Sequence, residues 1–269
     1  MKKKITVPDI LKMKREGRKI PVLTAYTFSV AHVLDRAGVP VLLVGDSVGM
    51  VEAGYDTTLP VTIEEMVYHT RSVARGSERA LVVSDMPFLS YQVSAEDARR
   101  NAGRLVKEGG AEAVKVEGGV RTAEAIGAIA SMDVPVMAHI GLTPQSVHRM
   151  GGYKVQGRGE GGGSGKEILR DARAVEEAGA FAIVLEAIPA VLAKEITSTL
   201  SIPTIGIGAG PDCDGQVLVV NDMLGLASGK ELPRFVKKYA DLEGVITKAV
   251  GDYMEDVEKG RFPTKEHSY

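Results

Sequence analysis

Two charged side chains, Lys115 and Glu117, lie in an otherwise apolar stretch near the middle of the chain, from Ala113 to Gly119. Side chains alternate along a β-strand, so Lys115 and Glu117 share one face. The stretch falls within an alternation of helices and strands, which predicts a parallel strand covered on both faces. Two charges on such a strand, just before a glycine turn, indicate either an internal ion pair or half of an active site at the carboxyl end of a barrel.

Four other predicted strands also end in polar residues, and these ends decide between the two explanations. They supply Asp46 with Ser47, then Asp85, His139 and Glu186. The residues two positions earlier are apolar, so we expect the polar side chains to share the inward face with core residues. These apolar residues are Val44, Val83, Met137 and Val184. Five successive strands with polar ends are hard to assign to ion pairing alone, and we predict a catalytic site.

The carboxylates in this set predict a metal ion. Asp46, Asp85 and Glu117 come from adjacent strands and can meet around one ion. Oxygen ligands without cysteine favour Mg²⁺, with Mn²⁺ or Co²⁺ as substitutes. Such an ion keeps positions open for substrate oxygens, and a 2-oxo acid offers two oxygens in chelating geometry. We therefore expect the metal to polarise a keto group and to stabilise an enolate.

The remaining polar residues can hold the substrate and move a proton. We expect Lys115 and Ser47 to bind the carboxylate of the oxo acid. Glu186, across the barrel, is the candidate base that removes the proton from the adjacent carbon. His139 can donate a hydrogen bond to the substrate or to a neighbouring side chain. Two structural alternatives stay open: Glu186 as the buried partner of a lysine such as Lys115, and His139 as a core histidine.

Eight predicted strands, most of them followed by a helix, must position these residues. Eight strands that alternate with helices over about 250 residues are typical of a (β/α)8 TIM barrel. A doubly wound open sheet is the alternative fold. We predict one α/β barrel domain over 1–269, with a short N-terminal helix and C-terminal helices. The strands are predicted at 20–26, 40–46, 80–85, 113–117, 134–139, 181–186, 203–208 and 217–221. The helices are predicted at 7–17, 29–37, 62–75, 95–108, 121–131, 166–178, 190–198 and 234–259.

A long loop after the fifth strand, from Gly141 to Gly165, exceeds the length of an ordinary connection. We expect it to be a mobile lid, with flexible surface as the structural alternative. Its glycines at 157, 159 and 162 fit Gly-x-Gly-x-x-Gly, but no strand precedes them, which argues against a dinucleotide site. The glycines from Gly206 to Gly210, after the seventh strand, are compatible with an anion site or with a tight turn.

Composition excludes several classes of function. The net charge is -2 and aromatic residues make up 5% of the chain, so nothing favours a nucleic-acid partner. The single cysteine, Cys213, excludes an internal disulfide and a cysteine zinc site. No apolar run of about 18 residues indicates a membrane span, and the basic start, Met1 to Lys4, precedes no apolar region typical of a signal peptide. We expect a cytoplasmic protein.

Several motifs together resemble the ketopantoate hydroxymethyltransferase family over nearly the whole chain. The resemblance implies a (β/α)8 barrel that transfers a hydroxymethyl group from 5,10-methylenetetrahydrofolate to 3-methyl-2-oxobutanoate. The product would be ketopantoate, on the route to pantothenate and coenzyme A. The motifs are Val44-Gly-Asp-Ser-Val-Gly-Met50, Ser84-Asp-Met-Pro-Phe88, Val114-Lys-Val-Glu-Gly-Gly119, Ala138-His-Ile-Gly-Leu-Thr-Pro-Gln145, Tyr153-Lys-Val-Gln-Gly157 and Ile205-Gly-Ile-Gly-Ala-Gly210.

The resemblance also implies roles for single residues. It places Mg²⁺ at Asp46, Asp85 and Glu117, substrate contacts at Ser47 and Lys115, and the proton acceptor at Glu186. We expect Asp46, Asp85 and His139 to lie against the oxo acid as well. The family further implies a homodecamer built of pentameric rings. One departure is visible, because the family usually continues with Lys/Arg-Thr-Glu-Glu after Gln156-Gly157, whereas this chain has the glycine-rich segment 158–165.

Three alternative functions are each less compatible with the sequence. A Mg²⁺-dependent oxo-acid lyase or mutase of the phosphoenolpyruvate/isocitrate type commonly has a catalytic cysteine in a loop, whereas Cys213 follows the seventh strand. A metabolite-binding barrel without catalysis would be marked by loss of Glu186, which is present. A scaffold gives no reason for five strands with polar ends.

Overall fold

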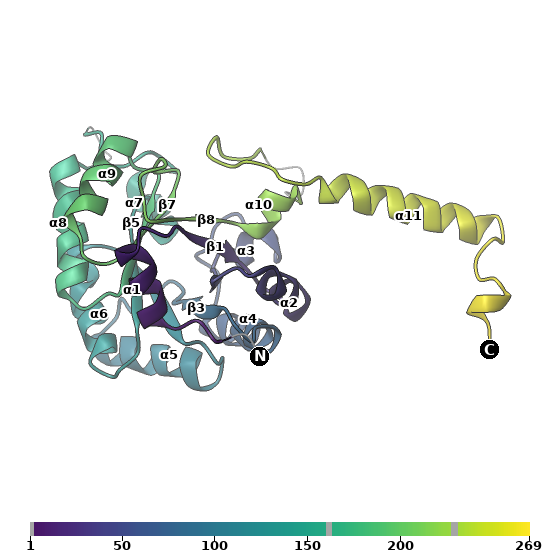
Figure 1. The fold of residues 1–269 in the computed structure, drawn as a ribbon, viewed down its shortest axis with the longest axis horizontal. Coiled ribbons are helices and arrows are strands. Elements are labelled where there is room, and N and C mark those ends of the chain that lie inside the picture. Colours follow the sequence, from purple (N-terminus) through teal and green to yellow (C-terminus); the bar gives the residue numbers. More distant parts are fainter. Residues whose placement is uncertain (1–2, 160–162, 227–230) are drawn as a thin grey trace. The chain divides into compact units, whose positions relative to one another are not determined.

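The computed structural model describes residues 3–159, 163–226 and 231–269. Within these ranges eight parallel strands form a closed barrel in chain order, and pairing of β1 with β8 completes the ring (Figure 1). This confirms the predicted (β/α)8 barrel and excludes an open sheet. The strands are β1 (Ile20–Thr24), β2 (Val41–Val44), β3 (Leu81–Asp85), β4 (Ala113–Glu117), β5 (Val136–Gly141), β6 (Ala182–Glu186), β7 (Thr204–Ile207) and β8 (Gly215–Leu218).

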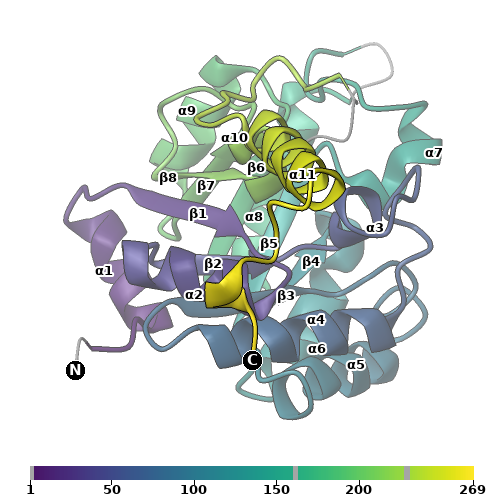
Figure 2. The same cartoon turned by 90° about the vertical axis from the view of Figure 1, so that its right-hand side faces the viewer.

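Helices follow most strands and lie outside the ring of strands (Figure 2). Two of them begin with a capping box, Thr62 with Glu65 and Ser164 with Glu167, so sequence-local hydrogen bonds fix their first turns. In the part of the chain that the structure describes, β7 and β8 are joined without a helix. The outer helices are α2 (Phe28–Ala37), α3 (Val48–Val51), α4 (Ile63–Gly76), α5 (Ala95–Lys107), α6 (Ala123–Ala130), α8 (Gly165–Glu177) and α9 (Ala190–Thr199).

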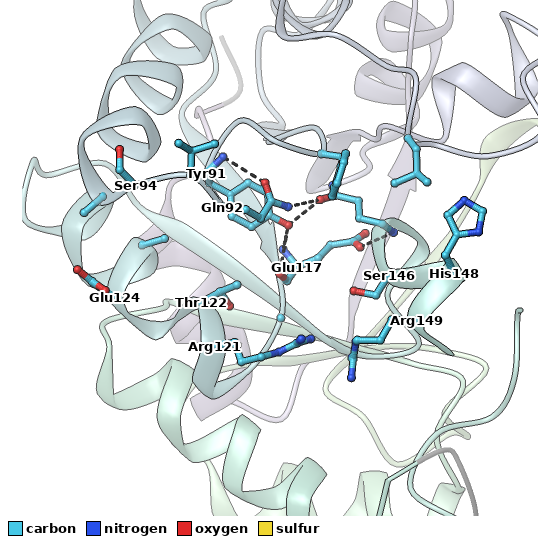
Figure 3. A pocket seen from close by; sticks show the side chains of 17 residues that line it. Tyr91, Gln92, Ser94, Glu117, Arg121, Thr122, Glu124, Ser146, His148 and Arg149 are labelled. Carbon is cyan, nitrogen blue, oxygen red and sulfur yellow. Dashed lines mark hydrogen bonds between the residues drawn. The ribbon is translucent and has the colours of Figure 1, made fainter. Parts of the chain in front are cut away.

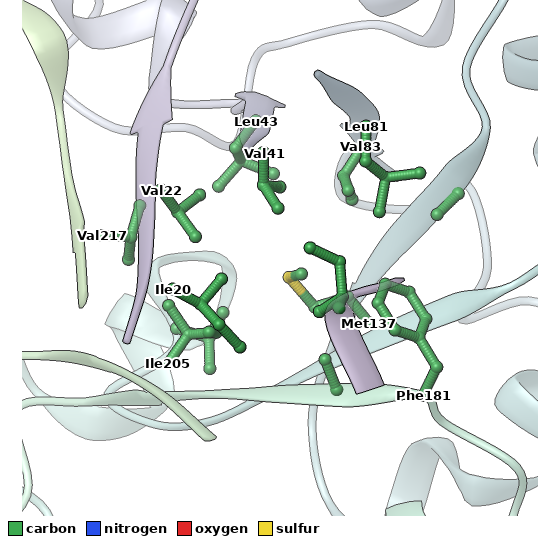
Figure 4. Close-up of a cluster of buried hydrophobic side chains, with 14 residues drawn as sticks. Ile20, Val22, Val41, Leu43, Leu81, Val83, Met137, Phe181, Ile205 and Val217 are labelled. Carbon is green, nitrogen blue, oxygen red and sulfur yellow. The ribbon is translucent and has the colours of Figure 1, made fainter. Parts of the chain in front are cut away.

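The amino-terminal half of the barrel interior is filled by apolar side chains (Figure 4). Every strand contributes at least one residue to this cluster, and α1 (Val7–Arg15) adds Ile10, which is 1% exposed. Because α1 packs its apolar face against the cluster, it covers one end of the barrel interior. The strand residues of the cluster are Ile20, Val22, Val41, Leu43, Leu81, Val83, Ala113, Met137, Ala182, Val184, Ile205 and Val217.

The eighth strand begins earlier than predicted. Sequence analysis expected it over 217–221, but β8 starts at Gly215, which pairs with Ile20 and Ile205 on its two neighbours. A Cβ at Gly215 would lie 2.2 Å from the backbone oxygen of Ile20, so only glycine fits where the barrel closes. Glycine has a low β-propensity, so the sequence pattern did not indicate that the strand starts there. The last two residues of the predicted strand belong to α10 (Val220–Leu224).

The helix predicted over 234–259 is wrong in its first third. The structure places the start of α11 (Leu242–Glu258) after Asp241. The backbone N–H of Tyr239 donates to the Met223 carbonyl oxygen at 2.8 Å, so this segment is held against the end of α10 instead of forming a helical turn. A short 3₁₀ helix, η3 (Lys265–His267), follows near the end of the chain.

The described chain divides into two compact units, residues 1–219 with the barrel and residues 220–269 with α10, α11 and η3. The single domain expected over 1–269 stays a prediction. No residue of α11 is buried, and Val245, Val250 and Tyr253 each expose half or more of their surface. Among the described helices, none combines the length and apolar character that crossing a membrane requires.

Candidate active site

Strand register brings the charged residues of β3, β4 and β5 together. Asp85 pairs with Lys115, and Glu117 pairs with His139. Neighbours in a parallel sheet point the same way, so these side chains meet at the carboxyl end of the barrel. Lys115 Nζ lies 2.8 Å from Asp85 Oδ1 and 3.7 Å from Glu117 Oε1, and all three side chains are at most 4% exposed.

Glu186, at the end of β6, faces His139. Its Oε2 lies 3.1 Å from His139 Nε2, while His139 Nδ1 lies 3.3 Å from Glu117 Oε1. The alternative of Glu186 as an ion-pair partner of a lysine is therefore not what the structure shows. Gly141 lets β5 approach, because a Cβ there would lie 2.2 Å from the Glu186 backbone oxygen. Ala187, which directly follows Glu186, has a φ of 47°. This backbone conformation is strained for a residue other than glycine, and such strain is common at functional sites.

Asp46 reaches the cluster by a different route from the predicted one. The residues of β2 in the barrel core are Val41 and Leu43, so the inference that Asp46 shares the inward face with Val44 is wrong. The strand ends at Val44, and alternation no longer applies to the residues after it. The Asp46 backbone N–H donates to Asp85 Oδ2 at 2.9 Å, which fixes the two aspartates next to each other.

Ser47 follows Asp46 at the edge of the cluster and is half-buried. Its hydroxyl is hydrogen-bonded to the hydroxyl of Tyr26, 2.8 Å away. Ser47 and Lys115 are thus both at the mouth of the barrel, and their predicted contact with a substrate carboxylate stays a prediction.

Gln145 is a member of the site that sequence analysis did not single out. Its Nε2 donates to Asp46 Oδ2 at 2.9 Å, and its backbone N–H donates to Glu117 Oε2 at 3.0 Å. Tyr91 Oη in turn donates to Gln145 Oε1 at 2.6 Å. Gln145 therefore connects two of the predicted metal ligands. The only signal for it in the sequence is its place at the end of the motif Ala138 to Gln145.

The segment predicted as a lid begins with ordered structure. It contains η2 (Pro144–Ser146) and α7 (Val147–Met150), and Tyr153 Oη lies 3.8 Å from Met50 Sδ. The middle of its glycine-rich part, 160–162, lies outside the described residues. The lid role of 141–165 stays a prediction.

The buried cluster holds more acidic than basic side chains. Burial raises the pKa of Asp46 well above its ordinary value, and the charges of Asp85 and Glu117 raise it further. Burial also raises the pKa of Asp85, although Lys115 acts in the opposite direction. For Lys115 burial is outweighed by Asp85, Glu117 and Asp46, so its pKa rises and the ammonium form is favoured.

His139 lies between two carboxylates, Glu117 and Glu186. Burial and the charge of Lys115 would lower the pKa of His139, but Glu117 and Glu186 outweigh them and raise it to about 9. Correspondingly, burial alone would raise the pKa of Glu117, whereas His139 and Lys115 hold it below its ordinary value. His139 Nδ1 also lies 3.2 Å from Lys115 Nζ, so the imidazole contacts both the carboxylates and the ammonium of the cluster.

The donor set suits a hard divalent cation. Asp85 Oδ1 has no hydrogen bond of suitable geometry in the described chain, although Lys115 Nζ lies close to it. As the side chains stand, no three His, Cys, Asp or Glu residues within the described ranges converge on a metal position. The carboxylates contact Lys115, His139 and Gln145 instead. A buried group of carboxylates that outnumber their basic neighbours is nevertheless a donor set of the kind that Mg²⁺ binds.

Comparison with known proteins identifies the family. The family model described as ketopantoate hydroxymethyltransferase matches residues 4–265. The chain belongs to the ketopantoate hydroxymethyltransferase family. Two relatives named 3-methyl-2-oxobutanoate hydroxymethyltransferase, from Pelobacter propionicus and Geotalea daltonii, are 60% and 61% identical over 269 residues. These residues are 100% of this chain and 98% and 100% of the relatives. Membership of this hydroxymethyltransferase family confirms the prediction of an enzyme that transfers a hydroxymethyl group.

A solved structure shares the fold at low sequence identity. It is 2,3-dimethylmalate lyase, a member of the PEP mutase/isocitrate lyase superfamily, with a TM-score of 0.61 and 16% identity. The match covers 97% of this chain and 91% of the lyase chain. At this identity the likeness shows the barrel fold and does not extend to the reaction.

Proposed function

We propose that this hydroxymethyltransferase forms ketopantoate from 3-methyl-2-oxobutanoate, with 5,10-methylenetetrahydrofolate as the one-carbon donor. The names of the full-length relatives support the oxo acid and the product. The observation that carries the proposal is the cluster at the carboxyl end of the barrel. There Lys115 and three carboxylates lie on one side of His139, and Glu186 lies on the other.

The cluster suits an anionic substrate that carries a keto group. Lys115, kept protonated by its carboxylate neighbours, and the Ser47 hydroxyl would bind the substrate carboxylate. Asp46, Asp85 and Glu117 would hold Mg²⁺, which when bound supplies a Lewis acid for the keto oxygen. Gln145 keeps Asp46 and Glu117 in place through its two hydrogen bonds.

Glu186 is the proposed base. It is the most accessible carboxylate of the cluster, with a side chain 15% exposed, whereas those of Asp85 and Glu117 are at most 4% exposed. His139 Nε2 lies 3.1 Å from the Glu186 carboxylate and is its nearest charged or polar neighbour in the cluster. Glu186 accepts the proton of C3, and the electron pair of that C–H bond moves into the keto group to give an enolate.

The transfer step then balances with one water molecule. C3 of the enolate forms a bond to the one-carbon unit, and the bonds from that unit to the donor nitrogens break. Water supplies the hydroxyl oxygen of the new hydroxymethyl group. The proton lost from C3 and the second proton of the water end on the two donor nitrogens, which releases tetrahydrofolate.

The proposal is tested by following the transferred carbon. The protein is incubated with 3-methyl-2-oxobutanoate, Mg²⁺ and 5,10-methylenetetrahydrofolate labelled with ¹³C in the one-carbon unit. We expect the label to appear as the hydroxymethyl carbon of ketopantoate in the ¹³C NMR spectrum. Absence of labelled ketopantoate, with the donor consumed by no other route, would contradict the proposed function.

Two further expectations stay predictions. The homodecamer of pentameric rings rests on the resemblance, and the cytoplasmic location rests on composition. Sedimentation velocity of the full chain measures the first, because a decamer of 28.6 kDa subunits separates clearly from a monomer or a dimer.

A further inference from the structure

A cavity of about 710 Å³ opens beside the carboxylate cluster (Figure 3). Its walls are the loops that follow β3, β4 and β5, including 88–95, 117–125 and 145–149. Glu117 and Gln145 belong both to the cluster and to the wall of this cavity. The cavity therefore borders the proposed reaction site at these two residues. Its volume is in the range of sites for drug-sized ligands, and a small oxo acid would fill only part of it.

Two arginines give the cavity an unbalanced positive charge. Arg121 and Arg149 line it on the same side of Glu117 (Figure 3). Neither guanidinium has an ion-pair partner within the described residues, although Glu124 also lines the cavity. Burial and the nearby charge of Arg121 lower the pKa of Arg149, which indicates that the two cations lie close together. Asp171, whose charge raises the pKa of Arg149, accepts a hydrogen bond from the Val120 backbone N–H at 2.9 Å.

Paired guanidinium groups that face a cavity are suited to a carboxylate or a phosphate, because their planar donors can bind two oxygens at once. The oxo acid cannot be the natural occupant of this position if its keto group lies at the carboxylate cluster. A second, longer ligand with an anionic end fits both the charge and the size of the cavity.

Part of the cavity wall is apolar. Phe88 and Val93 line the cavity and are 41% and 63% exposed, and Leu59 lies in the same wall. Leu89, next to Phe88, has φ of 70°, so this loop is held in a conformation that is unfavourable for leucine. An exposed aromatic ring on such a loop offers a surface for stacking a flat ligand.

We propose that this cavity binds the one-carbon donor, with its carboxylate tail at Arg121 and Arg149 and its one-carbon end at Glu117 and Gln145. The inference rests on the proposed function, because it takes the donor to be a reduced folate. The flat rings of the donor then lie along Phe88, and the glutamate end reaches the two arginines.

The test is calorimetric titration of the full-length protein with tetrahydrofolate and with tetrahydropteroate, which lacks the glutamate carboxylates. For the double variant Arg121→Gln/Arg149→Gln we expect affinity for tetrahydrofolate to fall at least tenfold. The wild-type protein should bind tetrahydropteroate about as weakly as the variant does, and the variant should not distinguish the two ligands. The matched control is Arg100→Gln on α5, whose guanidinium pairs with Glu96 outside the cavity and whose loss should leave both affinities unchanged.

Unchanged tetrahydrofolate affinity in the double variant would overturn the inference, and so would an equal loss for both ligands. The two single variants serve if the double variant does not fold, judged by circular dichroism. Failure of the proposed function is seen separately, because ¹³C transfer by the wild-type protein tests it without any change at the arginines. Loss of tetrahydrofolate affinity in the variants supports the cavity assignment whichever product forms.

Discussion

The two ends of the barrel interior are built on the same strands, from residues only two positions apart. On β3, Leu81 and Val83 belong to the apolar cluster, and Asp85 belongs to the charged one. On β6, Val184 precedes Glu186 in the same way. Leu81, Val83 and Asp85 are all at most 3% exposed, so burial does not distinguish the two ends. Only the chemistry of the side chains differs.

This difference indicates which end of the barrel interior stabilises the fold and which end is available for function. Apolar residues gain free energy from burial, whereas buried charges lose hydration that their partners must offset. At the carboxyl end the offset is incomplete, because the pKa values of Asp46 and Asp85 are raised by burial and remain so despite Lys115. Apolar residues would pack there as they do at the other end. The ligand proposed above would account for these charges.

Asp85→Asn is the substitution with the largest expected effect. It removes a carboxylate from the charged end of the barrel interior and keeps the side-chain volume. We expect kcat/KM to fall by at least about 10³-fold, because a proposed metal ligand is lost. The circular dichroism spectrum should stay native, since the barrel closes through backbone pairing. Turnover within tenfold of wild type would contradict the metal assignment.

Glu186→Gln should have the next largest effect. We expect kcat to fall by about 10²–10⁴-fold, the usual contribution of a positioned base. Affinity for the oxo acid should change little, because Glu186 lies on the far side of His139 from Lys115. Steady-state kinetics with calorimetry of the oxo acid separates the two quantities. A large loss of affinity with unchanged kcat would assign Glu186 to binding.

Leu81→Ala tests the apolar end of the same strand. Removal of this fully buried side chain should lower the free energy of unfolding by about 2–5 kcal/mol through lost burial and a cavity. Activity per folded molecule should stay close to wild type, in contrast to Asp85→Asn. Urea unfolding and turnover measured on the same preparation check both statements. A Leu81 variant that is stable but inactive would remove the distinction between the two ends.

Asp35 offers a second comparison, because it is a buried carboxylate whose two oxygens both accept hydrogen bonds. It is 4% exposed and accepts hydrogen bonds from the Ser77 hydroxyl and from the backbone N–H groups of Glu78, Arg79 and Ala80. Burial would raise the pKa of Asp35, but these donors outweigh it and lower the pKa below its ordinary value. Asp35→Ala should cost about 1–3 kcal/mol at pH 7 with little change in activity.

The sign of the pH dependence follows from the lowered pKa. The stabilisation from Asp35 is fully present above the ordinary aspartate pKa and is lost as pH falls through that value toward the folded pKa. The stability difference between wild type and Asp35→Ala should therefore shrink below about pH 4. Urea unfolding between pH 3 and pH 7 measures it. A difference that grows on acidification would contradict the assignment.

The sequence predicted much of this arrangement, because strand alternation is a local property. All five of these residues lie in the last three positions of a regular strand and meet at the carboxyl end of the barrel: Lys115, Glu117, Asp85, His139 and Glu186. Asp46 also meets them, but the alternation argument misplaced it, since its strand ends at Val44.

Other parts could not be predicted for physical reasons. Gln145 is uncharged and sits in a 3₁₀ turn, so neither charge nor periodicity marks it. Gly215 starts β8 because of close packing with Ile20, a contact between residues far apart in sequence. The start of α11 depends on the hydrogen bond from Tyr239 to Met223. Such features follow from tertiary contacts that no local pattern contains.

Hydrogen exchange at C3 of the oxo acid tests the central claim most directly. 3-Methyl-2-oxobutanoate is incubated in D₂O with the protein and Mg²⁺, and the C3 proton signal is followed by NMR with and without tetrahydrofolate. We predict loss of that signal with wild-type protein, and its retention with EDTA, with Asp85→Asn and with Glu186→Gln. Retention of the signal by the wild-type protein under both conditions would contradict enolisation at the charged end of the barrel.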